Sequence, residues 1–367
     1  MKRLAIIGAS YLQLPLILRA KELGYETHVF AWKADDVGEY AADCFYPISI
    51  VNKDEILAQC REIGICGVCS IASDLAAITV NYIANAMGLP GNSMEATAKS
   101  TNKHLMRMAF AENGDPSPKS ALFREGDEID ASAFQYPLIV KPTDRSGSRG
   151  ITKLETPDGL SEAVRNALKE SMEKKILIEE FAEGDEYSVE YISYRRKHHF
   201  LTVTEKHTTG APHFIETGHR EPAPLSDDMV SRIRKIVEHA LDSLGITDSA
   251  SHTELKISHD GQIRIIEIGG RMGGDCIGSD LVQLSTGIDY VRAVIQVATG
   301  QVPNLTPVGP SGDVECVYLL NSDDVRKLEH LKATLPQKLI REVYFKPELL
   351  SKTTDSSTRA GCYLRWV

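Results

Sequence analysis

The chain lacks any long apolar segment, since no uninterrupted run of nonpolar residues approaches the roughly 20 residues that a membrane-spanning helix needs. It also lacks an excess of positive charge. Its formal net charge is −10 at pH 7, which argues against general binding to nucleic acids or membrane surfaces. The sequence starts Met1-Lys2-Arg3 and leads directly into a short apolar strand, which is not the pattern of a signal peptide. We therefore expect a cytoplasmic protein that binds neither nucleic acids nor membranes.

Cysteine is scarce and shows no regular spacing. The seven cysteines, an odd number, are scattered from Cys44 to Cys362, which favours reduced thiols in a cytoplasm over a disulfide framework. Cys66 and Cys69 have the C-x-x-C spacing, but they lie in a continuous apolar run and no second pair accompanies them. We interpret this run as a buried strand and not as a redox or zinc site.

Several common enzyme signatures are also missing. The first predicted strand is followed by Gly8-Ala9-Ser10 and not by G-x-G-x-x-G, which disfavours a dinucleotide site. A Ser/Gly-rich loop at residues 143–150 does not end in G-K-S/T and no helix pattern follows it, so it is not a Walker A loop. No Ser-His or Cys-His arrangement suggests a side-chain nucleophile. Any nucleotide chemistry must therefore use another kind of site.

The length of 367 residues is enough for two or three domains, and 42% hydrophobic with 25% charged residues is ordinary for a globular protein. Strand and helix patterns alternate up to about residue 95, which indicates a β-α-β type of domain. The pattern then predicts one helix over residues 97–113 and another that begins at Asp227 and ends at Gly245. Residues 303–312 are rich in proline and glycine and resemble a linker.

The most informative segments are two predicted strands on either side of Asp260-Gly261, a pair that favours a tight hairpin. Such a hairpin brings Glu254 and Glu267 close together on adjacent strands. Two neighbouring carboxylates repel each other unless a cation lies between them, and Mg²⁺ prefers oxygen ligands of this kind. Arg271 and the Gly273-Gly274 turn follow at once and can receive an anion. These segments predict a site for a magnesium-bound nucleotide.

Two upstream segments complete this predicted site. Lys141 lies at the end of an apolar strand, directly before the Ser/Gly-rich loop, whose backbone N–H groups can approach phosphate oxygens. Residues 175–190 then form a predicted strand, a short acidic connector and a second strand. A connector of this kind can offer backbone groups to a purine edge and a carboxylate to ribose hydroxyls.

In this order the motifs resemble those of the ATP-grasp superfamily, and the resemblance covers nearly the whole chain. It is greatest to the branch that contains biotin carboxylase, carbamoyl-phosphate synthase and the bacterial amino-acid ligases. The resemblance implies that Glu254 and Glu267 bind metal and that Lys141 and Arg271 are catalytic. The ATP-binding residues that it implies are Lys103, Lys141, Ser146, Gly147, Ser148, Gly150, Glu179, Glu180, Phe181, Ala182 and Glu186.

The resemblance also implies an α/β fold in three parts. Residues 1–95 are expected to form a Rossmann-like parallel-sheet domain of the pre-ATP-grasp type, and residues 96–305 a two-lobed ATP-grasp domain. Residues 306–367 are expected to form a small, mostly β segment at the C-terminus. Dimers are common among relatives, so a homodimer is one expected assembly.

The implied activity is an ATP-dependent carboxylate–amine ligase that forms an amide through an acyl phosphate and releases ADP and phosphate. The expected cofactors are ATP and Mg²⁺, with Mn²⁺ as an alternative, and the favoured substrates are small-molecule carboxylates and amines, in particular amino acids. One alternative is a bicarbonate-activating enzyme similar to biotin carboxylase or carbamoyl-phosphate synthase. Another is a non-catalytic ATP-binding module.

The substrate side of the site has two readings at residues 210–222. These residues form either an irregular crossover or a substrate-facing loop that includes His213 and Glu216. Lys206, shortly before them, is a further candidate for contact with the γ-phosphate. Gly273 and Gly274 leave room for a substrate beside the backbone. Gly269 stands where the family usually has Asn, so one metal ion is expected to lose a side-chain ligand or to take water instead.

Overall fold

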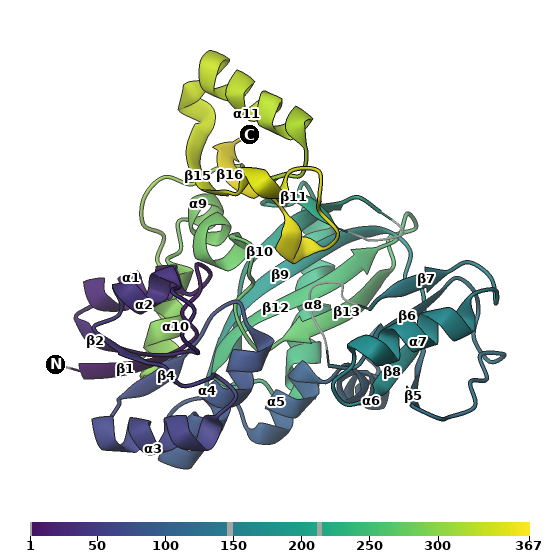
Figure 1. The fold of residues 1–367 in the computed structure, drawn as a ribbon, viewed down its shortest axis with the longest axis horizontal. Helices are drawn as coiled ribbons and strands as arrows, with labels where there is room; N and C mark the ends of the chain where they lie inside the picture. The colour runs from purple at the N-terminus through teal and green to yellow at the C-terminus, as the bar shows by residue number, and fades with distance from the viewer. Residues whose placement is uncertain (1, 145–149, 211–214) are drawn as a thin grey trace.

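The computed structural model describes residues 2–144, 150–210 and 215–367 (Figure 1). Three sheets organise these residues: a four-stranded parallel sheet near the N-terminus, a four-stranded antiparallel sheet, and an eight-stranded antiparallel sheet. The predicted α/β fold class is therefore confirmed. The predicted ATP contacts Ser146, Gly147 and Ser148, and the predicted substrate contact His213, lie outside the described residues.

The N-terminal part has the strand order β3-β2-β1-β4, and its strands pair in parallel. Residues 4–7 of the first strand are all buried, as expected of a parallel strand covered by helices on both faces. The elements are β1 (Lys2–Ile7), α1 (Leu14–Glu22), β2 (Tyr25–Phe30), α2 (Val37–Ala41), β3 (Cys44–Tyr46), α3 (Lys53–Ile63), β4 (Gly67–Cys69) and α4 (Asp74–Met87). Cys69 is buried on β4, so the predicted buried strand is confirmed there, and all seven cysteines are free thiols.

The single helix predicted over residues 97–113 is wrong, because the chain forms two helices there: α5 (Met94–Thr101) and α6 (Lys103–Asn113). Asn102 separates them in an extended conformation, and its side-chain oxygen accepts hydrogen bonds from the backbone N–H groups of His104 and Leu105. An asparagine that caps a new helix in this way competes with continuation of the old one. The break makes Lys103 the first residue of α6 and turns it toward the large sheet.

The small antiparallel sheet has the order β5-β8-β6-β7, and α7 packs against it, as the right-hand part of Figure 1 shows. Its elements are β5 (Ser120–Arg124), β6 (Leu138–Pro142), β7 (Thr152–Leu154), α7 (Leu160–Glu170) and β8 (Lys175–Glu180). Lys141 lies on β6, and β8 leads through a four-residue connector into the large sheet. This sheet and the large sheet are the two lobes that the sequence predicts.

The large sheet runs in the order β13-β12-β9-β10-β11-β14-β16-β15. Its strands are β9 (Asp185–Tyr194), β10 (Lys197–Thr208), β11 (Glu216–Glu221), β12 (Ser249–Ile257), β13 (Ile263–Gly269), β14 (Val314–Leu319), β15 (Leu339–Phe345) and β16 (Gly361–Trp366). Its helices are α8 (Asp227–Leu244), α9 (Val282–Thr286), α10 (Tyr290–Ala298) and α11 (Ser322–Thr334), with a π-helical turn at Ile277–Leu281. The predicted start and end of α8 are confirmed: Ser226 caps it and Gly245 ends it in a left-handed conformation.

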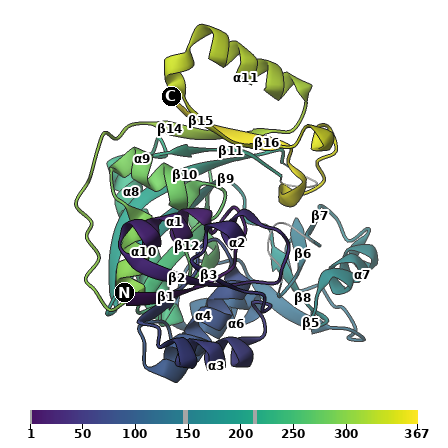
Figure 2. The same cartoon turned by 60° about the vertical axis from the view of Figure 1, so that its left-hand side comes forward.

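The C-terminal strands do not form a sheet of their own. β14 pairs with β11, so β14, β16 and β15 extend the large sheet, and α11 lies above them in Figure 2. The predicted boundary near residue 305 falls in a stretch without helix or strand. Because the sheet is continuous, residues of the C-terminal segment are brought beside residues of β11, which matters for the site below.

Helix α10 joins the N-terminal part to the large sheet. Its apolar side chains belong to the same buried cluster as the parallel sheet, and this cluster also includes Ile192 of β9 and Ala250 of β12. Both figures show α10 beside α1 and next to the large sheet. The buried interface fixes the N-terminal part against the strands that carry the candidate site. Among the described residues, every helix is too short or too polar to cross a membrane.

One buried carboxyl group gives the fold a measurable pH dependence. Glu221 on β11 is fully buried and accepts hydrogen bonds from the hydroxyls of Thr204 (3.0 Å) and Ser285 (2.9 Å). Burial raises the pKa of Glu221 to about 8, whereas an unfolded glutamate has an ordinary pKa of 4.5. The unfolded chain therefore releases this proton first, and the folded state loses stability as the pH rises from about 4.5 to about 8.

We expect the free energy of unfolding of Glu221→Gln to increase relative to that of the wild type as the pH rises across this window. The difference in unfolding free energy should grow with pH by up to about 1.4 kcal/mol per unit, because the variant has no proton to release. Urea unfolding at several pH values measures it, with Glu329→Gln on the exposed face of α11 as the control. A difference that stays constant from pH 5 to pH 8 would mean that Glu221 is ionised in the folded protein.

Candidate active site

The two predicted metal ligands face each other on the hairpin. Glu254 on β12 and Glu267 on β13 are register partners, and a bulge directly after Glu254 shifts the pairing of the following residues. Both side chains are partly exposed, at 29% and 24%. Each carboxylate already contacts an ammonium group: Glu267 contacts Lys103 at 2.7 Å, and Glu254 contacts Lys206 at 2.7 Å. The predicted juxtaposition of the two glutamates is confirmed, together with two lysines around them.

Lys206 is the electrostatic centre of this region. Its ammonium group contacts Glu254, Glu186 at 3.0 Å and Glu216 at 3.1 Å. Burial opposes the charge on Lys206, but the three carboxylates outweigh it and raise its pKa well above the usual value. Burial likewise opposes the charge on Glu254, but Lys206 and His252 hold its pKa well below the usual value. Lys206 and Glu254 are therefore both ionised at neutral pH.

A second buried ion cluster lies at the junction of α6 with the small sheet. Glu179 on β8 contacts Lys141 at 2.5 Å and Arg107 at 2.9 Å, and all three side chains are at least 95% buried. Burial raises the pKa of Glu179, but Arg107 and then Lys141 outweigh it and hold the pKa below its usual range. Burial is also the main reason why the pKa of Lys141 is lowered. Glu179 thus fixes Lys141 beside the start of the Ser/Gly-rich loop.

The connector between β8 and β9 is held from both sides. The backbone N–H of Phe181 donates to the carbonyl of Pro137 at 2.9 Å, and the carboxylate of Glu180 accepts from the backbone N–H of Gln135. The ring of Phe181 faces the ammonium groups of Lys153 and Lys256 at 4.1 and 4.6 Å. Residues 180–184, including Ala182, also line a groove of about 740 Å³ on the side toward the β12–β13 turn.

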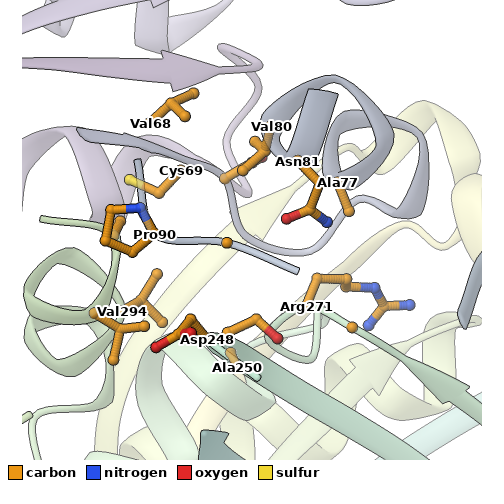
Figure 3. Close-up of a pocket in the computed structure, with 16 residues that line it drawn as sticks. Val68, Cys69, Ala77, Val80, Asn81, Pro90, Asp248, Ala250, Arg271 and Val294 are labelled. Atoms are coloured by element: carbon orange, nitrogen blue, oxygen red, sulfur yellow. The ribbon is translucent and has the colours of Figure 1, made fainter. Parts of the chain in front are cut away.

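Arg271 is held by the N-terminal part. Its guanidinium donates two hydrogen bonds to Asp74, the first residue of α4, from Nε at 2.8 Å and from Nη2 at 3.0 Å. A guanidinium and a carboxylate in this arrangement form a rigid pair. Arg271 borders a cavity of about 40 Å³, which is lined by residues of β4, α4 and α10 and by residues 248–250 (Figure 3).

The departure at Gly269 has a steric explanation. A Cβ atom at Gly269 would lie 2.9 Å from Oδ1 of Asp74 and 3.2 Å from Nε of Arg271. An asparagine, which the family usually has here, would therefore compete with the Asp74–Arg271 pair. Glycine at this position leaves room for that pair.

The Gly273-Gly274 turn is anchored to the sheet by Glu190 of β9. The backbone N–H of Gly273 donates to Glu190 at 3.1 Å, and Glu190 also forms a short hydrogen bond with His252. A Cβ atom at Gly273 would lie 2.7 Å from the Glu190 carboxylate, whereas one at Gly274 would meet only Ala72 at 3.4 Å. Gly273 is thus needed for the anchor, and Gly274 leaves free space beside it.

The reading of residues 210–222 as an irregular crossover is wrong for its second half, because residues 216–221 form β11. Glu216 points from the start of β11 to Lys206 and to Arg359, which it contacts at 3.2 Å. Gly150 lies at the far end of the Ser/Gly-rich loop in a left-handed conformation, packed against Glu170.

Sequence reasoning missed several charged residues of this region. They are Asp74, Arg107, Glu190, His252, Asp275 and Arg359. For His252 a signal exists, because residues two apart on a strand share a face, and Glu254 is a predicted metal ligand on the same strand. For Asp74 and Arg359 no local signal distinguishes them from surface charges.

Comparison with known proteins agrees with this geometry. Residues 134–280 match the model of the ATP-grasp domain family. Alanine–anticapsin ligase of Bacillus subtilis is 28% identical over 212 residues, which are 51% of this chain and 44% of that protein. The chain spans about half the length of the curated relatives that it matches, 55% and 44% for two of them.

The fold is similar to two solved structures across the whole chain. An L-amino acid ligase from Bacillus licheniformis has a TM-score of 0.80 at 23% identity, with 100% of this chain and 93% of that chain covered. A biotin carboxylase domain dimer of the 2-oxoglutarate carboxylase from Hydrogenobacter thermophilus, solved with MgADP, ADP and bicarbonate, has a TM-score of 0.76 at 16% identity, covering 100% and 86%. At these identities the likeness shows the fold alone. Residues 134–280 are thus identified as an ATP-grasp domain, and the chain as a whole has a fold similar to those of the two solved structures.

Proposed function

We propose that the protein is an ATP-dependent ligase that joins a carboxylate to an amine. ATP phosphorylates the carboxylate to an acyl phosphate with release of ADP. The amine nitrogen then attacks the acyl carbon, the bond to phosphate breaks, and an amide forms. The observation that carries this proposal is the pairing of Glu254 with Glu267 on adjacent strands, with Lys103 and Lys206 in contact with these carboxylates.

The donor set fits magnesium. Two carboxylates on opposed strands, both partly open to solvent, are oxygen ligands of the type that Mg²⁺ takes together with nucleotide phosphates. When bound, the metal would neutralise charge on the phosphoryl group during transfer. Lys103 and Lys206 are close enough to these carboxylates to contact phosphate oxygens beside the metal. The connector from Glu180 to Ala182 and the carboxylate of Glu186 would contact the adenine and the ribose.

Arg271 is the best candidate for holding the reacting phosphate or carboxylate. It follows Glu267 by four residues, and Asp74 fixes its orientation by two hydrogen bonds. A preorganised cation of this kind stabilises charge that develops in the transition state. Lys141, fixed by Glu179 at the start of the Ser/Gly-rich loop, would act on the phosphates from the small sheet.

Amino acids are the favoured substrates. A ligase for alanine and anticapsin is among the curated relatives, and an L-amino acid ligase has a similar fold. The carboxylates and the ammonium group of Lys206 beside Glu254 can form ion pairs with a small charged molecule. The free thiols agree with a reducing compartment such as the cytoplasm.

The test combines nucleotide binding with turnover. Calorimetry should show adenine-nucleotide binding that depends on Mg²⁺, and pairs of amino acids should release ADP and phosphate. With the amine replaced by hydroxylamine, a hydroxamate should form, because hydroxylamine traps acyl phosphates. ADP release with bicarbonate alone would favour carboxyphosphate chemistry, AMP release would favour an adenylate, and binding without any turnover would favour a non-catalytic module.

A further inference from the structure

Beside the metal glutamates lies a buried charged cluster that the proposed reaction does not use. It is built around Arg359, which precedes β16 and is only 3% exposed. Its guanidinium donates to Asp275 from Nη2 at 2.7 Å and to Glu216 from Nη1 at 3.2 Å, and it lies over the ring of Tyr318 at 3.7 Å. We call Arg359, Glu216, Asp275 and His219 the Arg359 cluster. Its members come from β11, from the turn after Gly274 and from the C-terminal segment.

Two polar groups of the Arg359 cluster lack partners. Both ring nitrogens of His219, which is 1% exposed, and Nε of Arg359 have no hydrogen-bond partner among the described residues. A ring nitrogen of His219 lies within 4.8 Å of carboxylate oxygens of Glu216 and Asp275. Buried polar groups without partners cost free energy, so these unpartnered groups point to a ligand that would satisfy them.

The Arg359 cluster adjoins the place where the amide would form. The ammonium group of Lys206 contacts both Glu216 and the metal ligand Glu254, so one side chain separates the two sites. On the other side, Asp275 directly follows Gly274, four residues after Arg271. The carboxylates of Glu216 and Asp275 are 18% and 25% exposed, while Arg359 lies deeper. Glu216 and Asp275 are therefore the part of the Arg359 cluster that solvent reaches.

The charges of this region select the kind of ligand. Glu216, His219 and Asp275 could in principle hold a metal ion, but Arg359 contacts both carboxylates and Lys206 contacts Glu216 as well. Arg359 and Lys206 therefore already contact these carboxylates, and burial lowers the pKa of His219 to about 3, so its ring is neutral. A further cation or a lone anion would add uncompensated charge to a buried site, whereas a zwitterion adds none.

We propose that the Arg359 cluster is the subsite for the amine substrate and that it selects a free α-amino acid. The α-carboxylate would bind the guanidinium of Arg359 and a ring N–H of His219. The amino group would lie against Glu216 and Asp275, toward the acyl phosphate. This inference rests on the proposed ligase function, and it assigns a specificity role to the C-terminal segment.

The test measures binding of amino acids separately from turnover. Saturation-transfer NMR with the twenty common L-amino acids, in the presence of Mg-ADP, should show at least one that binds the wild type. Its primary amide and its decarboxylated amine should not bind, because each lacks the carboxylate. Arg359→Gln should weaken binding of this amino acid by at least about 30-fold, since truncation of one partner of a buried charge pair has a large effect. Arg271→Lys should leave it bound.

The control is Arg365→Gln, which breaks another arginine–carboxylate pair, with Glu315, in the same segment. It should leave amino-acid binding unchanged. Asp275→Asn serves as a second variant if Arg359→Gln fails to fold, and it should weaken binding of the amino acid by a similar factor. The inference is overturned if no amino acid binds, if the amide binds as well as the acid, or if a folded Arg359 or Asp275 variant binds normally. Hydroxamate formation tests the ligase proposal separately from this subsite, because hydroxylamine has no carboxylate for the Arg359 cluster to bind.

Discussion

Glu254→Gln is expected to lower the rate of ADP release by at least about 100-fold at ordinary Mg²⁺ concentrations while leaving the fold intact. The change removes one negative charge from the proposed metal site, and charge stabilisation by a metal is worth several kcal/mol, where each 1.4 kcal/mol is about tenfold in rate. The fold should survive because Lys206 keeps its contacts with Glu186 and Glu216. A steady-state ADP assay and a thermal melt measure the two quantities.

Glu267→Gln should have a similar effect on the rate, but it is a less clean test. It removes a carboxylate that contacts the buried Lys103 at 2.7 Å, so some loss of stability is expected as well. Glu95→Gln is the matched control, because it removes the carboxylate of an exposed glutamate–lysine pair on α5. Near wild-type turnover by Glu254→Gln would rule out this glutamate as a metal ligand.

The hairpin that carries these glutamates could be predicted because its signals are local. Asp260-Gly261 marks the turn, and Gly261 adopts the positive φ of 79° that the turn requires. A two-residue turn at Asp260-Gly261 pairs Glu254 with Glu267, whereas the residues next to the turn pair one residue out of that register, and the bulge after Glu254 restores the predicted pairing. The same holds for α8, whose cap and glycine stop lie within its own sequence.

The partners of these residues could not be predicted in the same way, since they come from distant segments. Asp74 lies 197 residues before Arg271, and Arg359 lies 143 residues after Glu216. In the sequence both are ordinary charged residues, and only the docking of the N-terminal part and the extension of the large sheet bring them into place. The helix break at Asn102 is hidden for another reason: the apolar pattern continues across it, and the signal for the break is the capping side chain of the asparagine alone.

Arg271→Lys is expected to lower turnover by about 100-fold with little effect on nucleotide affinity. A lysine cannot reproduce the two hydrogen bonds that join Nε and Nη2 to Asp74, and a flexible ammonium group is not held in place for the transition state. Asp74→Asn should cause part of the same loss, since the arginine is then present but less well oriented. Comparison of kcat with the dissociation constant for Mg-ADP separates the two effects.

Gly269→Asn also tests the Asp74–Arg271 pair, because it introduces the residue that the family usually has at this position. Its Cβ atom must displace Asp74 or Arg271, because it would lie 2.9 Å from Oδ1 of Asp74 and 3.2 Å from Nε of Arg271. If the glycine exists to make room for this pair, Gly269→Asn and Asp74→Asn should each lower turnover, and the double variant should be little worse than either alone. Gly312→Asn is the control, because a Cβ atom there meets only Trp366 at 3.6 Å. Faster turnover in Gly269→Asn would instead show that a missing metal ligand limits the turnover rate. Asp74 would then not be needed to orient Arg271.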